Sequence, residues 1–223
     1  MIIRTAAIAE TPDDLLSQLE QQAWYLPTLA KMGRHRQCEW LTVRVLLKKI
    51  LGEEKQISYT PAGKPYFADS SQFISISHTK GYVAVALDEF YPVAIDIEQI
   101  SPRVEKLRSR FMDETEEQHL SKTQPLIHSL LHWSAKEAIY KYMDESDIDF
   151  KWQLHIHPFD PIMGEWQELK AHETRTERQQ NFIVRYFVGK EYVLCLISSP
   201  SDNPTGLKLF DCEKIENSPH AYC

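Results

Sequence analysis

The chain has 223 residues and a formal net charge of −7; 43% of its residues are hydrophobic and 26% are charged. These proportions are ordinary for a globular protein, and the acidic balance gives no support to a general nucleic-acid binder. No apolar run approaches the roughly 20 residues that a membrane-spanning helix needs, and residues 1–5 lack the features of a signal peptide. The four cysteines are widely spaced, which argues against a disulfide framework or a thiolate zinc site. We therefore expect a cytoplasmic protein that has no membrane segment and binds no nucleic acid.

The first 100 residues are predicted to run from helices into an antiparallel sheet. Helical periodicity and strand-like runs follow one another, and Gly52 is a natural stop for the second helix. The predicted segments are helices at residues 13–25 and 37–51 and strands at residues 73–78, 82–87 and 93–99. Short turns between the three strands predict an antiparallel meander.

The last of these strands places two carboxylates on one face. A period of two puts Asp96 and Glu98 on one side and Val93, Ile95 and Ile97 on the other. Carboxylates about 6.6 Å apart along a strand repel each other unless a cation lies between them. Taken alone, Asp-x-Glu is more often the solvated face of an antiparallel sheet.

Ser101-Pro102 breaks the pattern and divides the chain into an N-terminal half, residues 1–100, and a C-terminal half, residues 101–200. The second half again runs from helices into strands. Its predicted segments are helices at residues 104–111, 114–121 and 126–143 and strands at residues 152–157, 166–172, 181–188 and 192–198. Gly189-Lys190 predicts a hairpin. Pro, Asn, Asp and Ser are scattered through the tail, residues 201–223, and favour partial disorder.

The helix at residues 126–143 holds a charged stripe. At about 100° per residue, Trp133, Glu137 and Lys141 share one face. The opposite, core-facing side consists of Leu131, Ala135, Ala138, Ile139 and Tyr142. A Glu-Lys pair at this spacing is most often a solvated pair that stabilises the helix by about 0.2–0.5 kcal/mol. Together with the two strand acids, however, it predicts a site for a divalent metal and a phosphate.

The whole pattern resembles a known family, the 4'-phosphopantetheinyl transferases. The length and the extended N-terminal portion are similar to the long, surfactin-type branch, and Gly63-Lys64-Pro65 fits that branch. The motif-bearing stretch runs from about residue 34 to residue 141. The motifs that carry the resemblance are Ser75-Ile76-Ser77-His78-Thr79, Ala94-Ile95-Asp96-Ile97-Glu98 and Trp133-Ser134-Ala135-Lys136-Glu137-Ala138-x-x-Lys141.

The resemblance implies an α+β fold in which two similar halves with antiparallel sheets pack as a pseudo-dimer within a monomer, with the active site between them. It implies transfer of the 4'-phosphopantetheine arm of coenzyme A to a serine of an apo acyl or peptidyl carrier protein. Adenosine 3',5'-bisphosphate would be released. Asp96, Glu98 and Glu137 would hold Mg²⁺, for which Mn²⁺ is an alternative. Glu137 is predicted to act as the base, and Lys141 to contact the reacting phosphate.

The resemblance also implies contacts to coenzyme A from residues outside the acids. His78 is expected to contact a phosphate, and Ser77 and Thr79 to assist. Lys136, which points elsewhere on the helix, is assigned a contact with the pantetheine phosphate or a partner. Three upstream basic residues are assigned to the 3'-phosphate of coenzyme A: Arg36, Arg44 and Lys64. Nearby alternatives are Lys31, Arg34 and Lys48.

Three alternatives to a transferase are open to different degrees. A catalytically degenerate relative could bind coenzyme A or a carrier protein without transferring the arm. A Mg²⁺-dependent hydrolase of pyrophosphates related to coenzyme A could use the same charges. A Ser-His-acid hydrolase is disfavoured, because Ser77 and His78 are adjacent on a strand and point to opposite faces.

Overall fold

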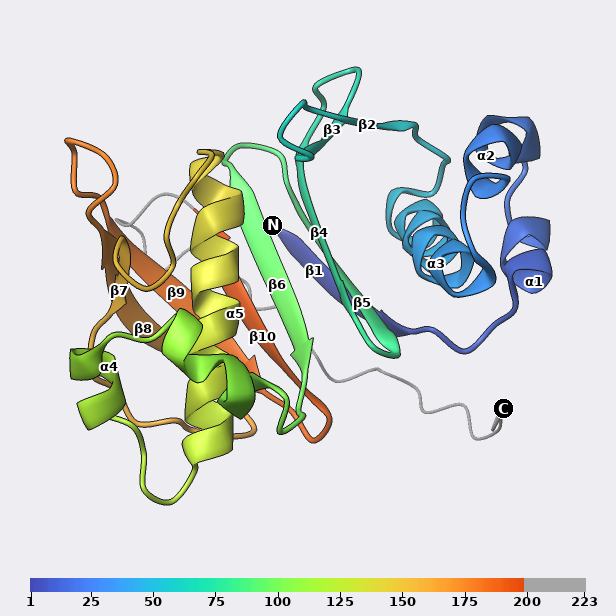
Figure 1. Ribbon diagram of the computed structural model, residues 1–223. Helices are drawn as coiled ribbons and strands as arrows, with labels where there is room; N and C mark the ends of the chain where they lie inside the picture. The colour runs from blue at the N-terminus through green and yellow to red at the C-terminus, as the bar shows by residue number, and fades with distance from the viewer. Residues whose placement is uncertain (199–223) are drawn as a thin grey trace.

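The computed structural model describes residues 1–198 (Figure 1). The predicted tail, residues 201–223, lies outside the described residues, as do Cys212 and Cys223. Before residue 100 the chain forms β1 (Ile2–Ala7), α1 (Pro12–Ser17), α2 (Gln22–Leu29), α3 (Arg34–Leu51), β2 (Ile57–Tyr59), β3 (Pro65–Phe67), β4 (Phe73–Thr79), β5 (Tyr82–Asp88) and β6 (Val93–Gln99). The remainder forms a 3₁₀ helix, η1 (Val104–Arg110), followed by α4 (Glu114–Gln118), α5 (Pro125–Met143), β7 (Leu154–Ile156), β8 (Trp166–Glu173), β9 (Asn181–Val188) and β10 (Tyr192–Ser198).

The described residues are arranged in layers around two main antiparallel sheets (Figure 1). One sheet has the order β1-β5-β4 and the other the order β6-β10-β9-β8-β7, while β2 and β3 form a separate hairpin. Helix α3 covers the outer side of the first sheet, and α5 covers the outer side of the second. This confirms the α+β class with antiparallel sheets that the sequence predicted.

The alternation of β-strand side chains explains the layers. Even-numbered residues of β4 and odd-numbered residues of β5 pack against α3, as Ile74 and Val85 do with Leu47. The opposite side of the first sheet packs on the second sheet through small and β-branched side chains, among them Ala84 and Ile95. Each sheet therefore buries both of its faces over part of its area.

Helix α5 begins at Pro125, which suits a first helical turn, and ends at Asp144 in a left-handed conformation. The predicted core-facing side of this helix is confirmed, since Leu131, Ala135 and Ile139 are fully buried against the second sheet. Gly52 ends α3 with a φ of 74° and donates its backbone N–H to the carbonyl of Lys48. Both helices thus have the boundaries that their sequence signals favour.

The predicted meander of three strands is wrong. β4 and β5 form the expected hairpin, but β6 pairs with β10, where Asp96 lies opposite Cys195. A meander would need the free edge of β5, and β1 occupies that edge, with Ile2 opposite Leu87. Strand β1 was not predicted from the sequence. As a result β6, which precedes the proposed boundary at residue 100, hydrogen-bonds within the second sheet.

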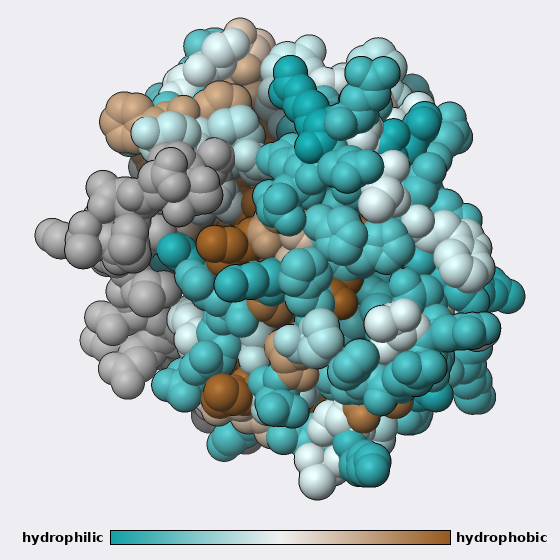
Figure 2. Space-filling view, turned by 90° about the vertical axis from the view of Figure 1, so that its left-hand side faces the viewer, coloured by the Kyte–Doolittle hydropathy of each residue, from teal (hydrophilic) through white to brown (hydrophobic). Residues whose placement is uncertain are grey.

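The face at the left of Figure 1 is seen front on in Figure 2 and is largely hydrophilic, with separate apolar side chains. The hairpin predicted at Gly189-Lys190 is confirmed, because it joins the paired strands β9 and β10. None of the helices within residues 1–198 combines the length and the apolar character needed to cross a membrane.

Candidate active site

The ammonium group of Lys141 joins α5 to strands β4 and β6. Its Nζ atom donates to the Asp96 carboxylate at 2.8 Å, to the Ser77 hydroxyl at 2.9 Å and to the Ile95 carbonyl at 3.2 Å. Asp96 is buried, whereas the Lys141 side chain keeps 28% exposure. The structure therefore brings together the lysine of the helix and the first acid of the strand, as the sequence predicted.

Glu98 lies two residues further along β6 and is held from two sides. Its Oε1 accepts a hydrogen bond from the Trp133 indole at 2.8 Å, and its Oε2 accepts one from the Thr79 hydroxyl at 3.3 Å. Burial raises the pKa of Glu98, and the nearby charge of Asp96 raises it further. Trp133 therefore orients an acid, in addition to packing against Phe111.

Glu137 completes a group of three carboxylates, Asp96, Glu98 and Glu137, which we call the acid cluster. Burial raises the pKa of Glu137, the charge of Asp96 adds to the effect, and together they bring the pKa to about 7 despite the opposing charge of Lys141. Three carboxylates face one ammonium group. The cluster therefore has an excess of acid that a cation would neutralise.

The chemistry of these donors suits a hard divalent cation, although their arrangement is not a finished metal site. Within residues 1–198 no three His, Cys, Asp or Glu side chains are arranged as a ready set of metal ligands. One oxygen of the cluster, Oδ2 of Asp96, is nevertheless buried and has no hydrogen-bond partner among the described residues. A buried carboxylate oxygen without a partner is costly, and Mg²⁺ and Mn²⁺ prefer such oxygen ligands. Asp96, Glu98 and Glu137 are the residues that would hold the ion.

A basic group lies on the other side of β4. His78 points away from the acid cluster toward α3, where its Nε2 lies 2.7 Å from Nη1 of Arg36 and 3.5 Å from the carboxylate of Glu39. Burial and the charge of Arg36 lower the pKa of His78. Ser77 and His78 thus project to opposite sides, which agrees with the argument against a Ser-His-acid hydrolase. Half of the Arg36 side chain is exposed and available to a ligand.

Arg44 is more deeply placed. Its side chain is buried, its guanidinium lies 3.5 Å from the centroid of the Trp40 ring, and its Nη2 donates to the Tyr59 hydroxyl. Burial lowers the pKa of Arg44. Its predicted contact with coenzyme A stays a prediction.

Lys136 lies on a different face of α5 from Lys141 and is fully buried. Its Nζ atom donates to Glu116 at 2.7 Å and to the backbone carbonyls of Phe111 and Phe150 at 2.6 and 3.0 Å. An ammonium group has three donors, and all three are used here. The structure therefore assigns Lys136 a structural role in place of the predicted contact with a phosphate or a partner.

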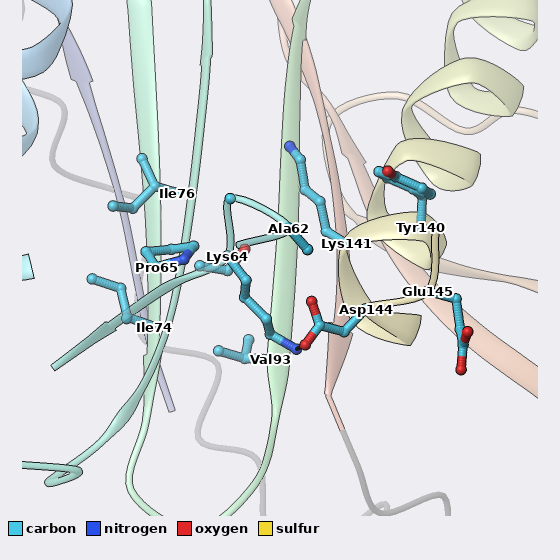
Figure 3. A pocket seen from close by; sticks show the side chains of 12 residues that line it. Ala62, Lys64, Pro65, Ile74, Ile76, Val93, Tyr140, Lys141, Asp144 and Glu145 are labelled. Carbon is cyan, nitrogen blue, oxygen red and sulfur yellow. Dashed lines mark ion pairs between the residues drawn. The ribbon is translucent and has the colours of Figure 1, made fainter. Parts of the chain in front are cut away.

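A pocket opens beside Lys141 (Figure 3). Ile74 of β4 and Val93 of β6 supply apolar side chains, and Lys64 faces Asp144 across the opening, with 3.8 Å between Nζ and Oδ2. Gly63 has a φ of +87° in the turn between β2 and β3, a conformation that favours glycine. Gly63-Lys64-Pro65 therefore turns the chain so that the lysine lies at the pocket.

Two polar residues of this region were not predicted from the sequence. Glu39 is buried between Arg36 and His78, and Asp144 faces Lys64. Glu39 could have been suspected from its spacing of three residues after Arg36 on a helix. No local signal identifies Asp144, because its partner is distant in the sequence.

Residues 92–197 match a family model described as the 4'-phosphopantetheinyl transferase superfamily. The acid cluster and Lys141 therefore lie within the matched region. Over residues 92–197 the chain is therefore similar to this superfamily.

Two curated relatives are similar to the chain over 102 residues, each with 30% identity. They are the 4'-phosphopantetheinyl transferase AcpT of Salmonella typhi and the protein of the same name from Salmonella typhimurium. The similar region covers 45% of this chain and 47% of each relative. The chain thus spans about half the length of the curated relatives that it matches.

Proposed function

We propose that this protein transfers the 4'-phosphopantetheine arm of coenzyme A to a serine hydroxyl of an apo acyl or peptidyl carrier protein. The other product is adenosine 3',5'-bisphosphate. The observation that carries this proposal is the acid cluster beside Lys141, inside the region that matches the superfamily. Both relatives are named as 4'-phosphopantetheinyl transferases, which supports the same reaction class.

Glu137 is the proposed general base. Without a metal ion, burial and the charge of Asp96 raise its pKa to about 7, so this carboxylate is more basic than an ordinary glutamate. The serine oxygen then forms a bond to the β-phosphorus of coenzyme A. The bond from this phosphorus to the bridging oxygen breaks, and the electron pair leaves with adenosine 3',5'-bisphosphate. Helix α5 holds Glu137 in place, because Ala138 and Ile139 anchor its other side in the core.

Lys141 is proposed to stabilise charge on the phosphates. Its side chain is 28% exposed, and its ammonium group is held by Asp96 and Ser77, so it is positioned before a ligand arrives. Mg²⁺ bound at the acid cluster would supply charge neutralisation of the pyrophosphate, and Mn²⁺ is the alternative ion. The carboxylates also need this charge, since Lys141 alone does not balance them.

Arg36, His78 and Lys64 are proposed to bind the phosphates of coenzyme A. The exposed side chain of Arg36 and the ring of His78 form a basic group on one side of β4, and Lys64 lies at the pocket beside Lys141. Arg44 would support this group from its buried position next to Tyr59. Arginine and lysine are the side chains that recognise phosphate.

We also propose that the protein belongs to the long, surfactin-type branch and is a monomer whose halves divide near residue 100. We propose a cytoplasmic location, where the protein would encounter coenzyme A and carrier proteins. These points rest on the sequence pattern. An acidic carrier would need a local basic or apolar surface, because this chain has a net charge of −7.

Intact-mass analysis of apo carrier proteins tests the proposal. After incubation with coenzyme A, Mg²⁺ and this protein, a carrier should gain one phosphopantetheine arm, and a Ser→Ala variant of the carrier should gain none. A protein that binds coenzyme A without changing any carrier would be a degenerate relative. Consumption of coenzyme A without a carrier would identify a hydrolase, and either result would overturn the proposal.

A further inference from the structure

Strands β4 and β6 lie side by side at the junction of the two main sheets. β4 belongs to the first sheet and β6 to the second. The contacts pair Ser75 with Ile95 and Thr79 with Gln99, each 20 residues apart, so the two strands run in the same direction. Hydroxyl side chains of β4 occupy this junction at every second position. We call Ser75, Ser77 and Thr79 the hydroxyl seam.

Two of the three hydroxyls replace backbone hydrogen bonds. The Ser75 hydroxyl accepts the backbone N–H of Ile95 at 3.0 Å, and the Thr79 hydroxyl accepts that of Gln99 at 3.0 Å. A buried backbone N–H needs such a partner, and a serine or threonine side chain supplies it where two sheets meet. These contacts fix β6 relative to β4.

Ser77 differs from its two neighbours in the hydroxyl seam. Its hydroxyl donates to Oδ1 of Asp96 at 2.8 Å and accepts from Nζ of Lys141 at 2.9 Å. Ser77 is 5% exposed, so neither bond is easily exchanged for water. Because the hydroxyl binds Oδ1, the other oxygen of Asp96, Oδ2, is buried without a hydrogen-bond partner among the described residues. Ser77 therefore determines which oxygen of Asp96 remains for a cation.

We infer that Ser77 is a positioning residue that holds Asp96 and Lys141 in register for metal and phosphate binding, rather than a direct contact to coenzyme A. This inference rests on the proposed function for its choice of metal. Hydrogen-bonded partners of this kind orient metal-ligating carboxylates, and their loss typically lowers metal affinity about 10–100-fold. Thr79 acts similarly on Glu98, though at the longer distance of 3.3 Å.

The test compares Ser77→Ala with the matched variant Ser75→Ala. Each removes one buried hydroxyl from the same strand, but only Ser77 touches the acid cluster. Both variants should lower the melting temperature by about 2–4 °C, the effect of about one hydrogen bond in a chain of this length. Mn²⁺ affinity, measured by electron paramagnetic resonance with coenzyme A present, should fall at least ~10-fold in Ser77→Ala only. Ser77→Thr keeps the hydroxyl and should restore most of the affinity.

Three results would overturn the inference. Equal losses of Mn²⁺ affinity in Ser77→Ala and Ser75→Ala would show a general weakening of the hydroxyl seam. Unchanged Mn²⁺ affinity with a raised KM for coenzyme A would make Ser77 a direct ligand contact. If the wild-type protein binds no Mn²⁺, there is no bound metal whose affinity Ser77 could affect. The melts and the Mn²⁺ titration need no carrier protein, so they are independent of whether the arm is transferred.

Discussion

Helix α5 carries charged clusters on two of its faces, and they differ in the balance of their charges. On one face, Lys136 and His132 surround the single carboxylate of Glu116, and we call these three residues the balanced cluster. On another face, Lys141 pairs with Asp96 and lies near the charges of Glu98 and Glu137, the other members of the acid cluster. The balanced cluster is fully buried and its ammonium group has three partners. The acid cluster is partly exposed, and within residues 1–198 Oδ2 of Asp96 has no hydrogen-bond partner, as is also true of Nδ1 of His132 in the balanced cluster.

The two glutamates show the same contrast. Burial pushes the pKa of Glu116 upward, but the His132 ring and the Lys136 ammonium group beside it outweigh burial and hold the pKa at about 2. Burial and Asp96 raise the pKa of Glu137 to about 7. A perturbed acid whose charge is compensated by the protein holds the fold together. One whose charge is not compensated is suited to a ligand or a proton.

The largest expected effect concerns catalysis. Glu137→Gln keeps the shape of the side chain but removes its charge, so kcat should fall by about 10²–10⁴-fold. Steady-state kinetics with an apo carrier measure this, with Glu168→Gln as the control, because Glu168 is a surface residue paired with Arg185. A loss confined to KM would assign Glu137 to binding alone and would break the contrast between the clusters.

The two lysines should differ in their effect on stability. Lys136→Met leaves the charge of Glu116 buried and uncompensated, so the free energy of unfolding should fall by about 3–5 kcal/mol. Lys141→Met should cost less, because the Lys141 side chain keeps 28% exposure and water screens its ion pair more than that of the fully buried Lys136. Urea denaturation of both variants gives the comparison. A larger loss for Lys141→Met would reverse the structural roles of the two clusters.

Acid should weaken the balanced cluster in a defined pH window. The folded-state pKa of Glu116, about 2, lies below its ordinary value of 4.5, so its stabilising contribution is complete above pH 4.5 and is lost as pH falls toward 2. The contribution is on the order of 3 kcal/mol, since one pKa unit corresponds to about 1.4 kcal/mol. Unfolding of wild type and Glu116→Gln across this range measures it. Parallel pH profiles for the two proteins would contradict the assignment.

A smaller effect is expected at the basic group beside β4. Dephospho-coenzyme A lacks the 3'-phosphate, so its kcat/KM should be about 10-fold lower, the size of one charge-assisted hydrogen bond. Arg36→Ala should narrow this difference between the two substrates, whereas Arg4→Ala should not, because Arg4 is an exposed residue of β1. If wild type uses both substrates equally well, Arg36 and His78 serve another purpose.

Local periodicity was sufficient to predict much of the fold and part of the site. The 3.6-residue repeat placed Glu137 and Lys141 on one face of α5, and the two-residue repeat separated Asp96 from Ile95 on β6. The burial of Lys136 could not be predicted, because its partners Glu116, Phe111 and Phe150 come from segments whose packing no local pattern specifies. Pairing of β6 with β10 and the hydroxyl seam likewise depend on contacts between residues far apart in the sequence.

Thermal melts with both ligands test the central claim, that the acid cluster needs a cation which the pyrophosphate of coenzyme A helps to hold. At a hundredfold excess over Kd, bound ligand should stabilise the fold by about 2.7 kcal/mol. For a chain of this length that is a shift of about 5–10 °C. Wild type should show this shift only with coenzyme A and Mg²⁺ together, and Asp96→Asn should lose it. A full shift with coenzyme A alone, or an equal joint shift in Asp96→Asn, would contradict the account.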